Sequence, residues 1–272
     1  MRLKITHTTE YRYDQPVAYT LQRLRLTPQS SPGQSVLSWQ VAVDGAVVEA
    51  GFDDHFGNRV QLVAGEGGSS HLHIAASGEV ETEDRTGVFG PHAGDTPLWL
   101  FLRDTPRTKA GKQVRELARG LPEDDPLARM HALMNAIHDS VSYQPGMTGT
   151  ETTAEEALKA GHGVCQDHAH IFISAARALD IPARYVSGYL MMDGQEEQTA
   201  THAWAEVHLP GLGWVGFDAA NRVCPDARYV RIASGLCYAD AAPVSGMRIG
   251  PAGENLSVAV VVRRQEQAQG QN

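Results

Sequence analysis

The chain has 272 residues, of which 42% are hydrophobic and 20% are charged. This length and composition predict a globular protein with sizeable cores, and the length is sufficient for two compact units. The 23 lysines and arginines against 32 aspartates and glutamates give a formal net charge of −9. A nucleic-acid-binding role that follows a phosphate backbone therefore has no electrostatic support, and an anionic partner is not favoured.

No targeting or membrane-spanning segment is visible in the sequence. The N-terminus has neither an apolar core nor a small-residue cleavage site, and no stretch approaches the roughly 18 consecutive apolar residues of a bilayer span. We therefore expect a soluble, cytoplasmic protein without a membrane partner. Cys165, Cys224 and Cys237 are an odd number of cysteines without close spacing, which argues against a disulfide framework and predicts at least one free thiol.

Residues 1–85 show the alternation of apolar and polar residues that is typical of half-buried strands. Turn-rich segments separate the alternating stretches, so a small antiparallel β-sandwich is the predicted product. Asp53, Asp54 and His55 form a polar cluster that could be considered for a metal, but we interpret it as a solvated turn because these residue types are common at exposed turns.

Residues 86–112 are rich in Gly, Pro and Thr and are interpreted as a linker. An apolar run at 98–102 within it should dock the linker against a domain. The apolar period then becomes helical: Asp125 and Pro126 predict an N-cap and a first turn, and apolar residues follow at steps of three and four as far as Val141.

Two further helices are predicted around a glycine-rich turn. Thr152 and Glu155 have the spacing of a capping box, which predicts a short helix that stops at Gly161. Cys165 begins the next helix, and Pro182 marks its end. Beyond it the pattern predicts a tight hairpin and a polar, disordered tail at 263–272. The strands expected in this half are 183–191, 201–209, 213–218, 228–232 and 256–262.

The helix beginning at Cys165 has the features of a nucleophile site. A thiol attacks only as the thiolate, and an ordinary thiol pKa of about 8.5 leaves little of it at neutral pH. The unpaired N–H groups and the positive dipole end of a helix N-terminus stabilise a thiolate and can also donate to an oxyanion. Gly161 and Gly163 allow the backbone to turn sharply just before the thiol.

A thiol of this kind also requires an imidazole and a carboxylate that orients it. Alternation along the strand 201–209 places His202 on the polar face and alanine and valine on the face that should carry the Cys165 helix. Asp218 ends the second strand of the hairpin. Antiparallel pairing about the turn puts His202 and Asp218 roughly opposite each other, so a Cys-His-Asp site is predicted.

The motifs Gly163-Val-Cys-Gln-Asp-His-Ala169, Thr201-His-Ala-Trp-Ala-Glu-Val207 and Gly213-Trp-Val-Gly-Phe-Asp-Ala-Ala-Asn221 together resemble the bacterial branch of the transglutaminase-like superfamily. The resemblance covers about 125–262. It implies a papain-like core in which Cys165 is the nucleophile, His202 the general base and acid, and Asp218 its orienting carboxylate. The N-terminal strands resemble the β domain that commonly precedes this core in bacteria.

The resulting prediction is an α+β chain with a β-sandwich at 1–85, a linker at 86–112, a transglutaminase-like core at 113–262 and the tail. It should act on a peptide or protein substrate, most simply as a cysteine peptidase or amidase, with protein-glutamine transamidation as the alternative. This chemistry requires no cofactor or metal. The loops at 145–152 and 193–200 are expected to shape the cleft.

Several neighbours of the three residues are candidates with competing interpretations. Gln166 could supplement the oxyanion hole or could be an ordinary residue of the first helical turn. Tyr143 could reach the site with its hydroxyl, although a packed aromatic is the favoured interpretation. Trp204 and Trp214 should wall the cleft or pack beneath it. Asp167 could simply favour the helix dipole.

The sequence alone leaves open two alternative functions from other classes. His162, Cys165, His168 and His170 lie close together in sequence and could hold a structural zinc, but His170 is rotated by about 200° from Cys165 on a helix. A degenerate, non-catalytic peptide-binding module is the other reading, and a complete set of Cys165, His202 and Asp218 argues against it.

Overall fold

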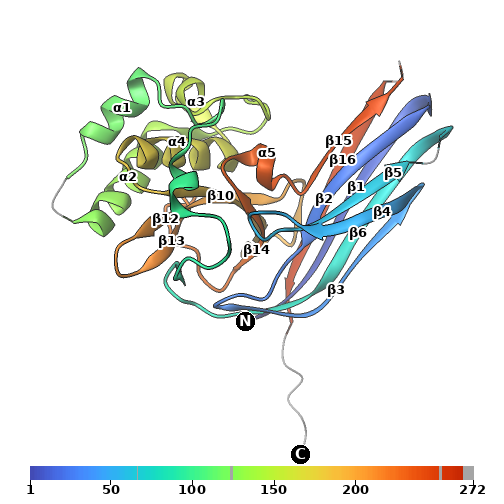
Figure 1. The fold of residues 1–272 in the computed structure, drawn as a ribbon, viewed down its shortest axis with the longest axis horizontal. Coiled ribbons are helices and arrows are strands. Elements are labelled where there is room, and N and C mark those ends of the chain that lie inside the picture. The colour runs from blue at the N-terminus through green and yellow to red at the C-terminus, as the bar shows by residue number, and fades with distance from the viewer. Residues whose placement is uncertain (66, 123–124, 251–252, 266–272) are drawn as a thin grey trace, which may run out of the picture.

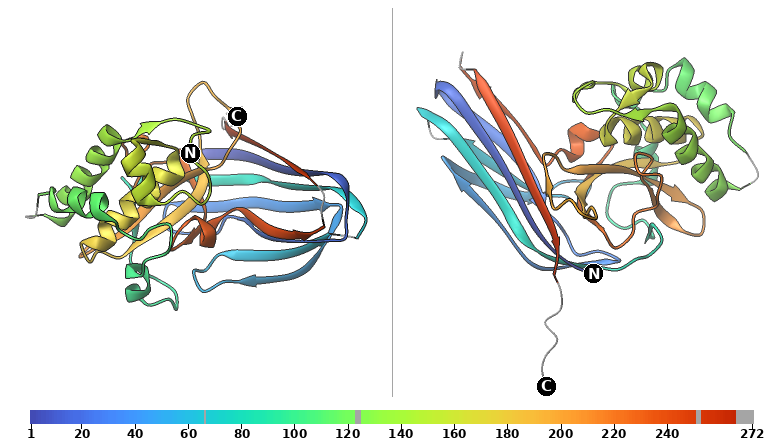
Figure 2. Two further views of the ribbon diagram at one scale, coloured as in Figure 1. Left: turned by 90° about the horizontal axis from the view of Figure 1, so that it is seen from above. Right: turned by 180° about the vertical axis from the view of Figure 1, so that it is seen from behind.

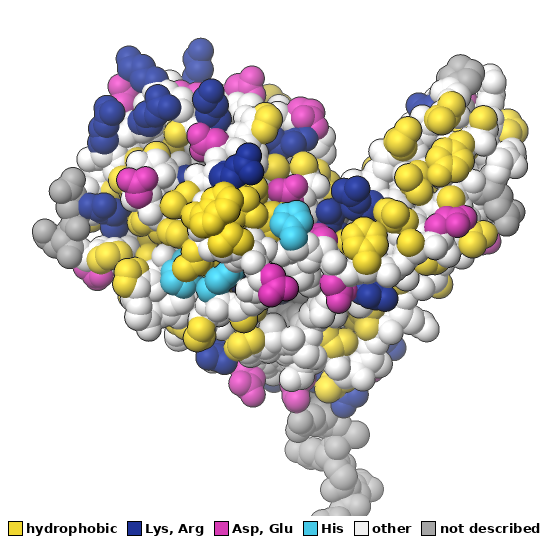
Figure 3. Space-filling model, viewed as in Figure 1, with side chains coloured by type: hydrophobic (Ala, Val, Ile, Leu, Met, Phe, Trp, Pro, Cys, Tyr) yellow, Lys and Arg dark blue, Asp and Glu magenta, His cyan; other side chains and the backbone are white. Residues whose placement is uncertain are grey.

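The computed structural model describes residues 1–65, 67–122, 125–250 and 253–265. The molecule has a V-shaped outline, in which one arm is a β-sandwich and the other carries the helices around a separate sheet (Figure 1). The hollow between the two arms remains in the space-filling view (Figure 3). The mixed α and β architecture with antiparallel sheets confirms the predicted fold class.

The sandwich is built on a long N-terminal strand, β1, whose alternate residues are buried. One sheet has the order β11-β16-β1-β6-β3 and the other the order β15-β2-β5-β4. Its first six strands are β1 (Arg2–Val17), β2 (Tyr19–Thr27), β3 (Gln34–Asp44), β4 (Ala46–Asp53), β5 (Arg59–Gly65) and β6 (Ser69–Thr82).

The end of the chain returns to this sandwich. β15 (Val244–Ile249) pairs with β2, and β16 (Glu254–Arg264) pairs with β1 over eleven residue pairs. Figure 2 shows these red strands beside the blue N-terminal ones. The assignment of the strand at 256–262 to the catalytic core was therefore wrong, because period-two alternation does not identify the pairing partner. Arg263 and Arg264 belong to β16, and residues 266–272 of the predicted disordered tail lie outside the described residues.

The second arm has one sheet of order β14-β10-β12-β13-β7, with helices over one face. Its strands are β7 (Val88–Gly90), β10 (Ala183–Leu190), β12 (His202–Leu209), β13 (Gly213–Phe217) and β14 (Tyr229–Gly235), and β8 (Ser142–Tyr143) pairs separately with β9 (His162–Gly163). The helices are α1 (Lys112–Arg119), α2 (Pro126–Ser140), α3 (Ala154–Ala160), α4 (Cys165–Ala178) and α5 (Tyr238–Ala241).

Helix α4 lies at the centre of this arm. The small residues Ala203 and Ala205 of β12 belong to the same buried cluster as its apolar face, as the alternation predicted. At the other end of α4, the buried Arg177 donates hydrogen bonds to four acceptors on separate segments of the chain. These are Phe101 O at 2.9 Å, Thr108 Oγ1 at 2.7 Å, Ala183 O at 2.8 Å and Leu236 O at 2.8 Å.

The segment predicted as a linker contributes to the core. Its β7 extends the sheet beside β13, and a short 3-10 turn, η1 (Leu98–Leu102), buries Phe101 against Trp214, with 4.9 Å between the ring centroids. The predicted docking of this apolar run is thus confirmed for Phe101, whereas Trp99 is 62% exposed.

The capping box of α3 differs by one residue from the predicted one. Thr153 and Glu156 form it, because Thr152 Oγ1 instead accepts a hydrogen bond from Gly149 N. Glu155 accepts from Gln113 N and thereby caps α1. Within the described residues, no helix combines the length and apolarity required to cross a bilayer.

Candidate active site

Cys165 occupies the first residue of α4, where the sequence placed it, and is buried. Gly161 ends α3 in the left-handed region at φ 69°, which a side-chain-bearing residue adopts only with strain. A Cβ on Gly163 would lie 2.7 Å from the Asp167 side chain. The two glycines therefore permit the tight approach between α3 and α4.

Asp167 holds the start of α4 in place. Its Oδ2 accepts hydrogen bonds from Val164 N at 2.8 Å and from Thr148 Oγ1 at 2.7 Å, and the side chain is buried. It thus ties the helix N-terminus to the 145–152 loop as well as complementing the helix dipole. The thiol is positioned by this local structure rather than by a flexible loop.

His202 and Asp218 meet as predicted, although the strand register differs. His202 Nε2 lies 2.6 Å from Asp218 Oδ2, and both side chains are buried. The ladder pairs Leu209 with Gly213 and Ala205 with Phe217, so its continuation places Asp218 opposite Trp204. The predicted register was wrong by two residues because the turn is centred on Gly211, and the carboxylate reaches His202 diagonally.

The electrostatics of the pair favour a charged imidazole. Burial by itself lowers the pKa of His202, but hydrogen bonds to Asp218 and Cys165 outweigh it and raise the pKa to about 10. Burial likewise opposes ionisation of Asp218, yet the hydrogen bond and charge of His202 hold the pKa of this carboxyl below its usual range. Since Nε2 contacts Asp218, Nδ1 is the ring nitrogen left for the sulfur of Cys165.

Two residues that the sequence analysis missed complete the surroundings of Asp218. Tyr229, from β14, donates its hydroxyl to Oδ2 at 2.8 Å, and Asn221 Nδ2 donates to the same oxygen at 2.8 Å. Backbone N–H groups of Ala220 and Asn221 donate to Oδ1. Asn221 lies within the third motif and could have been noticed there, whereas no local pattern connects Tyr229 with Asp218.

Tyr143 and Gln166 lie beside the triad. Tyr143 is 55% exposed, so it is not the packed aromatic that the sequence favoured. The pKa of its hydroxyl is raised, mainly because the residue is partly buried and to a smaller extent because the charges of Cys165 and Asp218 are near. Gln166 is half-buried, and its Nε2 lies 3.4 Å from Gly149 O, so this side chain contacts the 145–152 loop.

The two candidate tryptophans are both buried. Trp204 packs beneath the site, 6.4 Å from the ring of His202 and 5.4 Å from that of Tyr229. Trp214 is fully buried beside Phe101, and its Nε1 donates to His92 Nδ1 at 3.1 Å. Of the two alternatives predicted for these residues, both tryptophans therefore pack beneath the surface and do not wall the cleft at Cys165.

The predicted cleft loop at 193–200 contributes a strand to the sandwich. Its β11 (Glu197–Gln198) pairs with Val260 and Val261 of β16. Since His202 follows this loop by only a few residues, the pairing ties the beginning of β12 to the other arm. The loop therefore connects the two arms close to the candidate active site.

The remaining thiols and histidines have other environments. All three cysteines are free, whereas the odd number predicted only that at least one would be. Burial raises the pKa of Cys224 to about 11. Both ring nitrogens of His168 face backbone carbonyl oxygens, and His170 Nε2 accepts from Tyr238 N. Among the residues that the structure describes, no three His, Cys, Asp or Glu side chains are arranged to hold a metal, and the zinc reading is not supported.

The chain is similar to known proteins over nearly its whole length. The transglutaminase-like superfamily matches residues 115–219, and the bacterial transglutaminase-like N-terminal region matches residues 3–81. An uncharacterised protein of Mycobacterium bovis is 30% identical, covering 90% of this chain and 87% of the relative. A protein-glutamine gamma-glutamyltransferase of Pseudomonas aeruginosa is 29% identical over 152 residues, which are 51% of this chain and 21% of that protein.

A solved structure shares the whole fold. The crystal structure of a candidate cysteine protease from Cytophaga hutchinsonii superposes with a TM-score of 0.77 at 25% identity, covering 98% of this chain and 92% of that one. Both arms of the V are thus present in a relative of known structure. With the two matched regions, the three motifs and this shared fold, the chain belongs to the transglutaminase-like superfamily and carries the bacterial N-terminal domain of that family.

Proposed function

We propose that the chain is a thiol-dependent acyl-transfer enzyme that acts on an amide through a thioester on Cys165. The observation that carries this proposal is the pairing of a cysteine at the first residue of α4 with His202, whose pKa Asp218 and Cys165 raise to about 10. A positively charged imidazole beside the sulfur favours the thiolate, which is the reactive form.

The reaction would proceed in two steps. The Cys165 thiolate attacks the amide carbonyl carbon, and the N–H groups of Cys165 and Gln166, the first two residues of α4, donate to the developing oxyanion. The C–N bond breaks as protonated His202 delivers its proton to the leaving amine. Water or an amine then attacks the thioester, neutral His202 accepts the proton, and the thiolate is regenerated.

Hydrolysis of a peptide, isopeptide or glutamine amide is the activity we favour. The likeness to a candidate cysteine protease over nearly the whole of both chains supports it. The proposed steps use only side chains and backbone groups of this chain, and so require no cofactor. Tyr143, half-exposed beside the triad, is available to contact the substrate at the cleft.

Transamidation is the second candidate. The Pseudomonas aeruginosa relative bears the name of a protein-glutamine gamma-glutamyltransferase and matches half of this chain. Such an enzyme would use the same thioester and differ only in that a lysine or small amine, rather than water, accepts the acyl group. The two activities are separated by the ratio of acid to amide product in excess primary amine.

The test is turnover of peptide, isopeptide and glutamine substrates by the wild type and by two alanine variants. Cys165→Ala should reduce turnover on the order of 10⁴-fold or more, because it removes the nucleophile. Cys224→Ala is the matched control: its thiol pKa is raised to about 11 by burial, and the variant should keep wild-type turnover. Undiminished turnover in Cys165→Ala would end the proposal, as would the absence of an acyl adduct on Cys165 by mass spectrometry during turnover.

A further inference from the structure

A second cavity lies at the junction of the two arms, on the sheet face opposite α4. Alternation along β10 and β12 directs Arg184 and Glu206 to that face, since Ala183 and Ala205 pack with α4. Loops 29–32 and 56–58 of the sandwich close the cavity from the other side. Its volume is about 370 Å³, within the range of small-molecule sites, about 300–1,000 Å³.

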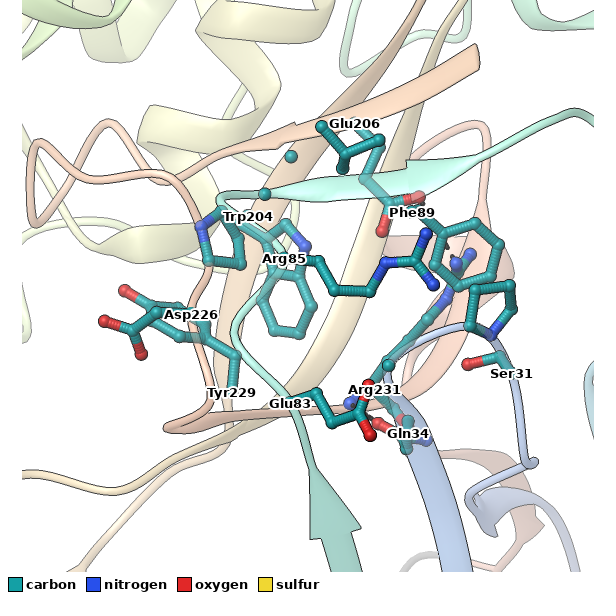
Figure 4. Close-up of a pocket in the computed structure, with 16 residues that line it drawn as sticks. Ser31, Gln34, Glu83, Arg85, Phe89, Trp204, Glu206, Asp226, Tyr229 and Arg231 are labelled. Atoms are coloured by element: carbon teal, nitrogen blue, oxygen red, sulfur yellow. Dashed lines mark hydrogen bonds and ion pairs between the residues drawn. The ribbon is translucent and has the colours of Figure 1, made fainter. Parts of the chain in front are cut away.

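The charged residues that line this cavity are both arginines, Arg184 and Arg231. The rest of the lining combines apolar rings with small polar residues. The main members of that set are Phe56, Phe89, Trp214, Ser30, Ser31 and Ser234. A smaller cavity of about 70 Å³ adjoins it and shares Arg231, Phe89 and Ser31 (Figure 4).

The two guanidinium groups are incompletely satisfied by the protein. Arg184 Nε donates to Glu206 Oε2 at 2.6 Å, and this is the one hydrogen bond of either guanidinium within the described residues. Arg184 Nη2 and Arg231 Nη1 lie 2.6 and 3.3 Å from the same oxygen, so both are ion-paired with Glu206, although neither is aligned to donate a hydrogen bond to it. One carboxylate thus serves two guanidinium groups, each with five N–H donors, which leaves the arginine pair with capacity for a further anion.

Aromatic rings hold both arginines in fixed orientations. The guanidinium carbon of Arg184 lies 4.0 Å from the centre of the Trp214 ring, and that of Arg231 lies 4.4 Å from the centre of the Phe89 ring. Stacking covers a face of each guanidinium and leaves its N–H edges available for polar contacts, of which Glu206 takes the Nε–Nη2 edge of Arg184. The side chain of Arg184 is only 8% exposed, so its position is set by the surrounding structure.

The local charge differs in sign from that of the whole molecule. The pKa of Arg184 is lowered to about 9, mainly by burial and then by Arg231, so the group remains protonated at neutral pH. The pKa of Glu206 is depressed, because the two arginines outweigh its burial. The two arginines that line the cavity and Glu206 beside them together carry an excess of one positive charge, in a chain of net charge −9.

We propose that this junction cavity binds a small organic anion, with a carboxylate or phosphate held by Arg184 and Arg231 and an apolar body against Phe56 and Phe89. Arg231 lies two residues after Tyr229 on β14, and Glu206 lies four after His202 on β12. The ligand would thus be bound by Arg184 of β10 and Arg231 of β14, strands of the same sheet as β12, which carries His202, but on residues separate from the triad.

The test is isothermal titration calorimetry at constant ionic strength with two anionic probes, benzoate and inorganic phosphate, and with benzylamine as a cation of similar shape. Benzoate, phosphate or both should bind and raise the unfolding temperature, and benzylamine should not. Binding of one anion alone identifies its acidic group as the one recognised. If neither anion binds, or if benzylamine binds as well as the anion, the proposal is overturned.

Two substitutions locate the binding. Arg231→Gln leaves the Arg184–Glu206 pair intact and should weaken binding about tenfold or more, because a charge-assisted contact is lost. Glu206→Gln should have the opposite effect and tighten binding, because it removes the neutralising charge. Unchanged affinity in a folded Arg231→Gln protein would place the anion elsewhere and refute the assignment.

Discussion

Replacing Asp218 with asparagine tests how the triad is activated. The carboxylate lies 2.6 Å from His202 Nε2, and its hydrogen bond and charge are major causes of the rise in the His202 pKa from 6.5 to about 10. At 1.36 kcal/mol per pKa unit, this rise represents roughly 5 kcal/mol of preference for the charged imidazole, shared between Asp218 and Cys165. Asparagine keeps the shape of the side chain and removes its charge.

Burial lowers the pKa of His202, and without the Asp218 charge only the Cys165 thiolate opposes this effect. The pKa of His202 should therefore fall well below 10. The imidazole would then be largely neutral at pH 8, and the thiolate would lose its counterion. We expect turnover to decrease on the order of a thousandfold, with some activity remaining, because the nucleophile and the helix N-terminus are intact.

The assay is the rate of iodoacetamide alkylation of Cys165 against pH, resolved by mass spectrometry from the other two thiols. Alkylation of the wild type should be rapid at neutral pH, whereas that of Asp218→Asn should be much slower at the same pH, because the sulfur has lost a charged neighbour. Asp226→Asn is the matched control, since this carboxylate pairs with Arg228 and not with the triad. A wild-type pH profile in a folded Asp218→Asn protein would refute the reasoning.

The interaction of His202 with Asp218 also predicts how the stability of the protein depends on pH. Because the pKa of His202 is higher in the folded state than in the unfolded chain, its contribution is complete below about pH 6.5 and is lost as the pH rises through about 10. Urea unfolding of the wild type should show this loss between pH 6.5 and 10. The loss should be much smaller in Asp218→Asn, and an equal slope in both proteins would contradict the assignment.

The remaining predictions concern the framework. His7 of β1, bonded to the Tyr189 hydroxyl at 3.0 Å, has a pKa lowered to about 4 by burial, so stability should fall by roughly 3 kcal/mol as the pH drops from 6.5 to 4. His7→Gln should make that loss smaller in urea unfolding, and an undiminished loss would exclude His7 as its source. Arg177→Met leaves three buried acceptors and one partly buried acceptor without their donor and should cost several kcal/mol of stability, a large part of a typical total of about 5–15 kcal/mol. An Arg177→Met protein as stable as the wild type would show that these hydrogen bonds contribute little to the free energy of unfolding.

Local patterns identified most of the elements that carry the candidate site. The helix beginning at Cys165, the stop at Gly161 and the face of β12 that carries Ala203 and Ala205 each depend on residues close together in the sequence, and the structure has all three, although both faces of β12 are buried. The match to the transglutaminase-like superfamily follows from three such local motifs in the right order. Steric preferences of the backbone and side-chain periodicity act over a few residues, which is why they can be read directly.

Pairings between distant segments could not be obtained in this way. Alternation predicted a strand near 256–262, but strands of either sheet share that pattern, and only the folded chain pairs β16 with β1. The two-residue error in the hairpin register has a similar origin, because the loop conformation determines which residue is the centre of the turn.

By itself, the sequence determined the family and the helix that begins at Cys165. It also identified the imidazole of His202 and the carboxylate of Asp218 as candidate site groups. The tertiary structure alone decided that Tyr229 and Asn221 hold the carboxylate, and that Arg184 and Arg231 meet at the junction of the two arms. The physical reason is that a residue's neighbours in space come from several strands and loops, and their convergence depends on register and packing throughout the chain. The motif of Gly163, Val164 and Cys165 thus marks the candidate nucleophile, while the fold supplies the charges around it.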